Sequence, residues 1–482
     1  MSTIDEFVLP AVATIQDCRS KLLRTIPQRG LGTEDVYQHL QHDIVPGLNR
    51  SSQSASFYGF VTGGTTPAAA FADNLVTQHD QNVQVHLPND TIATDVEDAA
   101  LRMLCNLVDL EEHEFNNRTF TTGATASNVI GLACGREYII AEMARRQGKT
   151  ASVSEDGIIE ALRIAGIDSI QILTTVPHSS LRKAASIVGL GRTCVKDLGL
   201  FQAKHNFDLA ALEQALKTPR TASIVSISCA EVNTGFFATS GDDMKTIRQL
   251  CDTYGAWIHV DAAFGLPARY LPKYEPKYAA LVDGVKNIIL ADSIAGDCHK
   301  LLNVPYDCGV FFSRHLDIGT RVFQNPNAAY LSSSSESSIP SPLNIGIENS
   351  RRFRALPVYA TLASYGREGH VELLERQISL ARCIAEFIAN TPSFQLLPQS
   401  PPSFAKVKEQ GIARIYNIVL FRATDPEINK ELVQRVNATR KIFISGTQWD
   451  GQPAARFAIS NWQVDVDRDM ALIKEVLLSV VS

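Results

Sequence analysis

Apolar residues cluster in short continuous runs along the middle of the chain, and stretches with helical spacing separate these runs. Short runs that are apolar on both faces predict strands buried in a mostly parallel sheet with helices packed against it. The predicted strands are 169–174, 222–229, 256–260, 287–291 and 309–313. We therefore expect one large α/β domain over residues 86–365.

The segments on either side of this region have other patterns. Residues 1–85 predict helices and turns. Residues 366–482 predict helices around two strands, 414–421 and 455–460, which is typical of a smaller α+β domain. A long polar loop with four consecutive serines, 329–350, precedes this domain. Loops of this length in compact domains are often functional.

The composition excludes several classes of protein. A chain of 482 residues, of which 45% are hydrophobic, is large enough for more than one hydrophobic core. The net charge of -6 at pH 7 provides no basic field for nucleic acid or an anionic membrane. No apolar stretch of about 18 residues exists, so we expect no transmembrane helix. The polar, acidic start of the chain lacks the pattern of a secretory signal.

The nine cysteines are scattered along the chain and never form a Cys-x-x-Cys pair. A disulfide framework or a structural zinc site would need clustered cysteines. We therefore expect free thiols, no bound metal and a cytoplasmic location, where thiols stay reduced.

An aspartate and a lysine follow two of the predicted strands. Asp261 comes directly after 256–260, and Lys300 follows 287–291 at the end of an Asp-Cys-His-Lys segment. Ligands of open α/β sheets bind at the carboxyl ends of the strands. A lysine there can form a Schiff base with an aldehyde, and a carboxylate can keep a pyridine nitrogen protonated. Taken singly, such an aspartate is more often a helix cap and such a lysine a surface charge, but the pair in this order favours a cofactor site.

Two further stretches have features of ligand-binding segments. Residues 121–128, Thr-Thr-Gly-Ala-Thr-Ala-Ser-Asn, precede a predicted helix whose free N–H groups and positive dipole end suit one phosphate. Their alternative role is a plain N-terminal cap. His178 lies just beyond strand 169–174, where an imidazole can stack on an aromatic cofactor, although such a histidine is more often a satisfied core or surface residue.

Together these motifs resemble those of the pyridoxal-phosphate-dependent group II amino-acid decarboxylases, which include glutamate, aromatic-L-amino-acid and cysteine-sulfinate decarboxylases. The helix start, His178-Ser-Ser-x-x-Lys-Ala, His-Val-Asp261-Ala-Ala and His299-Lys300 all match the family pattern, and the resemblance extends from about Tyr58 to Trp462. It implies an α/β, aspartate-aminotransferase-like (type I) fold. Such a fold has a large domain with a mostly parallel seven-stranded sheet and a smaller C-terminal α+β domain.

The resemblance also assigns roles to residues of this chain. Lys300 would form the Schiff base with pyridoxal 5′-phosphate, Asp261 would pair with the pyridine nitrogen, and His178 would stack on the ring. The other cofactor-binding residues would be Ala263 on the opposite ring face, and Ala124, Thr125, Ser293 and His299 at the phosphate. The substrate-binding residues would be Phe60, Thr62 and His86 at the entry and Arg456 at the α-carboxylate, although Arg456 has a salt bridge as its alternative role.

The implied reaction is decarboxylation of an L-amino acid to an amine and CO₂ through an external aldimine and a quinonoid. The family also implies a homodimer with the active site at the subunit interface.

The chain departs from the family pattern at two places. Asp297 replaces the asparagine of the family's Asn-Pro-His-Lys, and an acidic side chain is a poor phosphate ligand. Many family decarboxylases carry a loop tyrosine about nine residues before Arg-Arg-Phe-Arg that protonates the carbanion. Before Arg351-Arg352-Phe353-Arg354 this chain has Ser341-Pro342-Leu343-Asn344-Ile345, with no tyrosine at that place.

Several alternatives therefore stay open. Without that tyrosine, the chain could be an aldehyde synthase or a carbon–carbon bond-forming or bond-cleaving enzyme on the same scaffold. A catalytically silent binding homologue is the alternative from another class, although it would have no reason to keep Lys300, Asp261 and His178 together. A nicotinamide dehydrogenase is a weaker alternative, because no Gly-x-Gly-x-x-Gly follows a predicted strand. As possible pocket walls, Phe57, Tyr58, Phe60 and His86 allow an aromatic or medium-sized substrate.

Overall fold

The computed structural model describes residues 7–325, 339–398 and 411–481. The chain divides into two compact units, and each is described by itself. The first unit comprises Met1–Gly64, Arg376–Lys408 and Asn417–Ser482, and the second comprises Thr65–Glu375 and Glu409–Tyr416. The three-part division at residues 85 and 365 stays a prediction.

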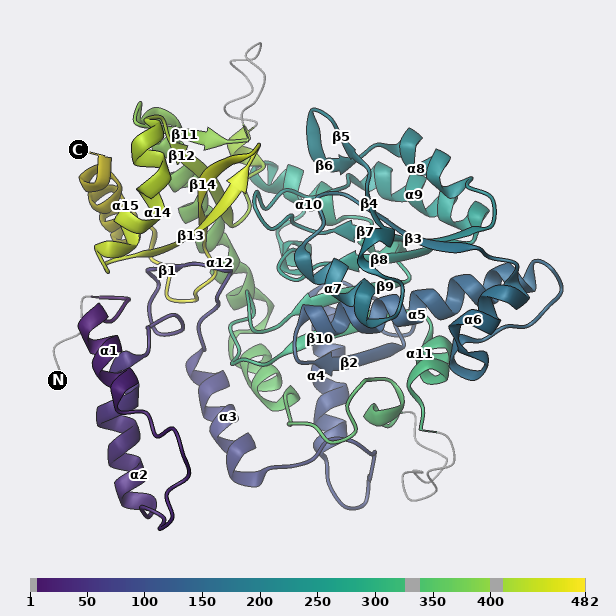
Figure 1. The fold of residues 1–482 in the computed structure, drawn as a ribbon, viewed down its shortest axis with the longest axis horizontal. Helices are drawn as coiled ribbons and strands as arrows, with labels where there is room; N and C mark the ends of the chain where they lie inside the picture. The colour runs from purple at the N-terminus through teal and green to yellow at the C-terminus, as the bar shows by residue number, and fades with distance from the viewer. Residues whose placement is uncertain (1–6, 326–338, 399–410, 482) are drawn as a thin grey trace. The chain divides into compact units, whose positions relative to one another are not determined.

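A seven-stranded sheet forms the centre of the second unit (Figure 1). In spatial order its strands are β2 (Asn117–Thr121), β10 (Gly309–Ser313), β9 (Ser293–Asp297), β8 (Trp257–Asp261), β7 (Thr221–Ser228), β3 (Ser169–Thr174) and β4 (Val195–Asp197). The strands from β9 to β4 are parallel, whereas β10 is antiparallel to both of its neighbours. The predicted seven-stranded, mostly parallel sheet is therefore confirmed.

Four of the five strands predicted for this region correspond to β3, β7, β8 and β10. The prediction for 287–291 was wrong, because Ile288–Leu290 form a short 3₁₀ turn and the strand begins at Ser293. A short apolar run has the same pattern whether it is a strand or a buried turn. The true strand, Ser-Ile-Ala-Gly-Asp, contains small residues, and a Cβ at Gly296 would lie only 3.2 Å from Leu266 and Val310.

Helices cover both faces of this sheet. Helix α5 (Ala124–Arg145) packs on β7, β8, β9 and β10, while α8 (Leu209–Leu216) and α9 (Gly241–Tyr254) lie on the other side in Figure 1. Other α-helices of the unit are α3 (Pro67–His79), α4 (Ala93–Leu107), α6 (Val153–Ala165), α7 (Ser179–Ile187), α10 (Ala279–Val285) and α11 (Leu316–Phe323). Two short strands, β5 (Gly199–Leu200) and β6 (Ala203–Phe207), pair separately.

The apolar core beneath α5 determines how closely this helix approaches the sheet. Ile130 of α5 shares a buried cluster with Ile172 and Trp257 of the strands. A Cβ at Gly131 would come within 2.4 Å of the His259 ring on β8. Only glycine allows so close an approach, and this contact fixes the position of α5 above β8.

Gly309→Ala is expected to destabilise the second unit by about 1–3 kcal/mol, the usual cost of overpacking a core. A Cβ at Gly309 would meet Gly123 Cα at 2.5 Å, so the start of α5 would have to shift. Urea denaturation of the purified protein would measure the change. Gly30→Ala is the control, because nothing lies within 4 Å of a Cβ there. Equal unfolding free energies for the two variants would contradict the prediction.

The first unit contains a smaller sheet of five strands. In spatial order these are β1 (Phe57–Tyr58), β13 (Phe443–Trp449), β14 (Gln452–Ala458), β12 (Ile418–Ala423) and β11 (Phe394–Leu397). Its helices include α1 (Val12–Ser20), α2 (Thr33–His39), α14 (Pro426–Ala438) and α15 (Val466–Val481). Helix α12 (Ala355–Asn390) has residues in both units and bends at Gly366, where φ is 58°. The predicted strands 414–421 and 455–460 overlap β12 and β14, so the smaller α+β fold is confirmed. No helix within the described ranges is long and apolar enough to cross a membrane.

Candidate active site

A cavity of about 340 Å³ lies in the second unit at the carboxyl ends of β7, β8 and β9. Open α/β sheets bind their ligands at such a place. The cavity is lined by Thr122, Gly123, Ala124, Thr125, Ala126, Val176, His178, Ser180, Ser228, Ala230, Val232, Asp261, Ala263, Phe264, Asp297, His299 and Lys300. The lining thus brings together Lys300, Asp261, His178 and the start of α5, which the sequence analysis singled out separately.

Two residues of this lining have a strained backbone. Val176 has φ 37° and Ala230 has φ 73°, in the left-handed region that favours glycine. Strain of this kind costs on the order of 1–3 kcal/mol and tends to persist at functional sites, where the surrounding structure holds it in place. The strained backbone therefore supports a functional role for this cavity, and this support does not depend on the chemistry of its side chains.

Lys300 reaches the cavity from the turn that follows β9. Its Nζ lies 3.1 Å from Asp297 Oδ2 and 5.5 Å from the centre of the Phe264 ring. The side chain is only 20% exposed, so this amine is not an ordinary solvated surface charge. A partly buried primary amine in a cavity can react with an aldehyde once it has lost its proton.

Asp261 is the last residue of β8, and its carboxylate is held in one orientation. Its Oδ2 accepts the side-chain N–H of Asn128 at 2.8 Å, and its Oδ1 accepts the backbone N–H of Ala263 at 3.2 Å. An ionised carboxylate oxygen can accept more than one hydrogen bond. The carboxylate can therefore keep these partners and also accept a proton-bearing nitrogen from a ligand.

A chain of hydrogen bonds connects Asp261 to the core. Asn128 Oδ1 lies 2.9 Å from His259 Nε2, and Ser293 Oγ lies 2.8 Å from His259 Nδ1 and accepts Trp257 Nε1–H at 3.0 Å. Because an indole only donates and a carboxylate only accepts, the direction runs from Trp257 to Asp261. Burial lowers the pKa of His259 to about 4, so at neutral pH its ring is uncharged and carries the single N–H that this chain needs.

Asn128→Leu is expected to lower the free energy of unfolding by about 1–3 kcal/mol, because it leaves buried hydrogen-bonding groups of His259 and Asp261 without their partner. Urea titration would measure this loss. Asn106→Leu, at an exposed position of α4, is the matched control and should change stability little. A variant at Asn128 that is as stable as the control would contradict the proposed role of this hydrogen-bond chain.

His178 combines a capping role with a place in the cavity wall. It is the N-cap of α7, and its Nδ1 accepts the backbone N–H of Ser180 at 3.2 Å and lies 2.6 Å from Ser180 Oγ. Since Nδ1 accepts, the proton of the neutral ring is on Nε2. These contacts fix the orientation of the imidazole beside the cavity.

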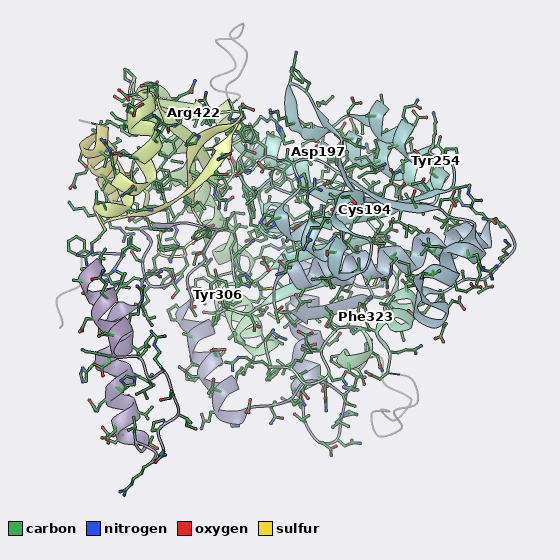
Figure 2. All side chains as sticks on the ribbon, in the orientation of Figure 1. Cys194, Asp197, Tyr254, Tyr306, Phe323 and Arg422 are labelled. Carbon is green, nitrogen blue, oxygen red and sulfur yellow. The ribbon has the colours of Figure 1, made fainter. Side chains whose placement is uncertain are left out.

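The start of α5 and His299 supply hydrogen-bond donors to the cavity. His299 Nδ1 accepts the backbone N–H of Cys308 at 3.2 Å, which places the proton of the neutral ring on Nε2. Burial lowers the pKa of His299, so this neutral form is favoured. The ring of Tyr306, labelled in Figure 2, lies 4.4 Å from that of His299 between centres. Donors at a helix start suit an anionic group.

A family model described as "Pyridoxal-dependent decarboxylase conserved domain" matches residues 16–403. The chain belongs to this family. This decarboxylase is 28% identical over 363 residues to L-2,4-diaminobutyrate decarboxylase of Acinetobacter baumannii, covering 74% of the chain and 67% of the relative. It is 24% identical over 466 residues to phenylacetaldehyde synthase of Arabidopsis thaliana, covering 95% and 88%. A crystal structure of Oryza sativa TDC with PLP and tryptamine superposes with a TM-score of 0.79 at 20% identity, covering 98% and 92%.

The lining of the cavity fits pyridoxal phosphate, the cofactor of this family, in three respects. Lys300 offers a primary amine for the aldehyde, and Asp261 offers an oriented carboxylate for the pyridine nitrogen. The start of α5 and His299 offer donors for the phosphate. Asp297 is the exception, because its carboxylate already accepts the backbone N–H of Ala124 at 2.6 Å.

Some predicted site residues do not reach this cavity. Ser293 is fully buried within β9, where it belongs to the hydrogen-bond chain behind Asp261. Its phosphate role was implied by the family resemblance, and in the structure Ser293 is the first residue of β9. His86 is 2% exposed and is held by Thr94 and Ser341, and it is not part of the lining. Both roles stay predictions without support from the position of the side chain.

The other substrate residues belong to the first unit, and their roles stay predictions. Phe60 is 65% exposed and has φ 61°. Thr62 is buried, and its carbonyl accepts the Ser460 hydroxyl at 2.8 Å. Arg456 is 7% exposed on β14. Phe57 and Tyr58, suggested as pocket walls, are buried in the aromatic core of this unit and pack on Phe443 and Phe457.

Other members of the cavity lining were not predicted from the sequence. Ser228, the last residue of β7, pairs in register with Asp261, so its place at the end of a strand was a usable signal. The strained Val176 and Ala230 left no signal, because backbone φ cannot be read from residue type.

Of the loop 329–350, residues 329–338 lie outside the described residues. In the remainder, Pro342 and Leu343 are buried and Leu343 N–H donates to Gln84 O at 3.1 Å. Among the described residues, no cluster of His, Cys, Asp and Glu could hold a metal ion.

Proposed function

We propose that this decarboxylase removes the α-carboxylate of an L-amino acid as CO₂ and releases the corresponding amine. The main support is the cavity in which Lys300, Asp261 and His178 lie together beside the start of α5. A catalytically silent homologue would have no need to keep an oriented carboxylate and a partly buried amine in one cavity. The proposal therefore favours an enzyme over a binding module.

Bound pyridoxal phosphate supplies an electron-withdrawing ring that accepts the electrons of the broken Cα–carboxylate bond. Lys300 would offer the amine that holds the cofactor. Asp261 would keep a proton on the ring nitrogen, and the hydrogen bonds from Asn128 and Ala263 hold its carboxylate in one orientation before the reaction begins. His178 Nε2–H can donate to a substrate carboxylate.

The substrate is proposed to carry an aromatic or medium-sized side chain. Phe264 is the aromatic side chain in the described cavity lining, and the lining has no arginine that could hold a second carboxylate. A panel of the twenty L-amino acids plus L-2,4-diaminobutyrate, read for CO₂ release and cofactor spectrum, tests this. Turnover of glutamate alone would overturn the substrate class, and no CO₂ from any amino acid would overturn the function.

Aldehyde formation is the second candidate, and the lack of a tyrosine in Ser341-Pro342-Leu343-Asn344-Ile345 favours it. A relative that is 24% identical is named as a phenylacetaldehyde synthase. Without a dedicated proton donor, the carbanion could react with O₂, giving aldehyde, ammonia and peroxide with the CO₂. Measuring CO₂, amine, aldehyde, ammonia and peroxide in one incubation distinguishes amine formation from aldehyde formation. Equal CO₂ and amine without peroxide would exclude the oxidative reaction.

A homodimer is proposed as the active form, and exposed apolar residues of the first unit support it. Between residues 12 and 48, Val12, Leu23, Ile26, Tyr37 and Leu48 are 56% to 92% exposed. Large apolar side chains with this exposure are favourable contacts for another chain. Light scattering of wild type and of Ile26→Asp would test the proposal, and a stable, active monomer would contradict it.

A cytoplasmic location is also proposed. All nine cysteines are free, and most are buried. Thiols in this state are typical of a reducing compartment. Subcellular fractionation tests the location, and recovery in an oxidising compartment would contradict it.

A further inference from the structure

The carboxylate of Asp297 occupies the place at the start of α5 that suits an anion. Its Oδ1 accepts the backbone N–H of Ala124 at 2.6 Å and lies 3.7 Å from His299 Nε2, and its Oδ2 lies 3.1 Å from Lys300 Nζ. The side chain is only 4% exposed. One buried carboxylate thus bridges the helix start and the lysine of the candidate site.

The backbone of Asp297 is held from both sides. Asp297 is the last residue of β9, it pairs with Gly309 of β10, and its N–H donates to Ala263 O at 3.2 Å. Any adjustment at this position must therefore come from rotation of the side chain. Space beside the carboxylate is also small, because a Cβ at Gly123 would lie 3.4 Å from Oδ1.

A phosphate group at this helix start would compete with the carboxylate for the Ala124 N–H. Both are anions, and two like charges so close together repel strongly in a site with little solvent. An asparagine would offer an acceptor to Ala124 and donors to the phosphate without that repulsion. The aspartate therefore works against the ligand that the rest of the lining suits.

We propose that Asp297 is an internal competitor of the cofactor phosphate. Its carboxylate holds the Ala124 N–H and the Lys300 ammonium when the cofactor is away, and it must release the Ala124 N–H when the phosphate binds. The inference rests on the proposed function, since it takes this cavity as the cofactor site. It makes Asp297 the residue that limits cofactor affinity, and it predicts that neutralising this side chain tightens binding of the phosphate.

The test compares pyridoxine 5′-phosphate with pyridoxine on the cofactor-free protein by calorimetric titration. Neither compound has an aldehyde, so the ratio of their dissociation constants reports the phosphate alone, without imine formation at Lys300. Asp297→Asn should raise the preference for the phosphorylated compound by about tenfold or more, equivalent to roughly 1.4 kcal/mol. Asp297→Ala should raise it in the same direction, although it offers no amide donor.

Asp242→Asn is the matched control. Asp242 lies in the first turn of α9 and its side chain is 92% exposed, so the Asp242→Asn substitution removes the same charge at a site away from the cavity. This variant should prefer pyridoxine 5′-phosphate over pyridoxine to the same degree as the wild type. If neither Asp297 variant prefers pyridoxine 5′-phosphate over pyridoxine more strongly than the wild type does, the inference about Asp297 is wrong, and the cofactor assignment is unaffected. Failure of wild type and variants to bind either compound would overturn the cofactor assignment as well.

Discussion

Lys300→Ala is expected to abolish covalent attachment of pyridoxal phosphate and to reduce turnover by several orders of magnitude. The Lys300 amine is the primary amine in the described lining of the cavity, and it is partly buried beside Asp297. No neighbouring group of that lining can replace it as the nucleophile for the aldehyde. The visible absorption band of the covalently held cofactor should therefore be missing. Borohydride reduction followed by peptide mass spectrometry should find no labelled peptide.

Lys300→Arg is the control for loss of charge. The guanidinium keeps a positive group beside Asp297 but cannot form an imine under these conditions. This variant should fold with the stability of the wild type and should also lack the covalent band. If either variant retained the band and the labelled peptide, another lysine would be the attachment site and the assignment would be wrong.

Asp261→Ala is expected to lower kcat by about 10²–10³-fold or more, because preorganised electrostatic groups of this kind often supply the largest single contribution to catalysis. Removing the carboxylate takes away the partner that keeps the ring nitrogen protonated. It also leaves the Asn128 amide, at the end of the buried hydrogen-bond chain, without its acceptor. Steady-state kinetics with the best amino acid of the panel would measure the loss.

Two further variants separate charge from geometry at this position. Asp261→Asn keeps the size of the side chain but not the charge, so it should lose nearly as much activity as the alanine variant. Asp261→Glu keeps the charge and displaces it, and it should retain more. Turnover close to that of the wild type in Asp261→Ala would exclude this carboxylate from the mechanism.

The sequence predicted the strands that have strong apolar patterns and failed where the pattern was weak. Strands β8 and β10 were predicted within about a residue, because Trp-Ile-His-Val and Gly-Val-Phe-Phe-Ser are apolar and lie between clear breaks. Strand β9 was misplaced, because its residues are small and polar while the preceding turn is apolar. Packing against Leu266 and Val310 demands those small residues, and a local pattern does not contain such long-range contacts.

The residues of the candidate site were also predicted where the local sequence pattern is strong and misassigned where it is weak. Residues that stand directly after strong strands or at a helix start, such as Asp261 and Ala124, were predicted and lie at the cavity. Ser293 was assigned from its place in a motif, and it points into the hydrogen-bond chain instead because β9 begins later than expected. The contact between Asp297 and Ala124 joins two segments that are far apart in sequence, so only the folded chain reveals it.

The order of strands in the seven-stranded sheet has a consequence for how the protein matures. The walls of the cavity come from segments spread between Thr122 and Lys300, and these meet only after β7, β8 and β9 have paired across their crossover helices. Parallel pairing of distant segments forms slowly, because chain entropy is lost before the contacts that compensate for it are made. A growing polypeptide therefore cannot capture the vitamin-derived coenzyme early in its synthesis. A coenzyme that binds the native state in preference to the unfolded one is expected to stabilise the finished protein by mass action.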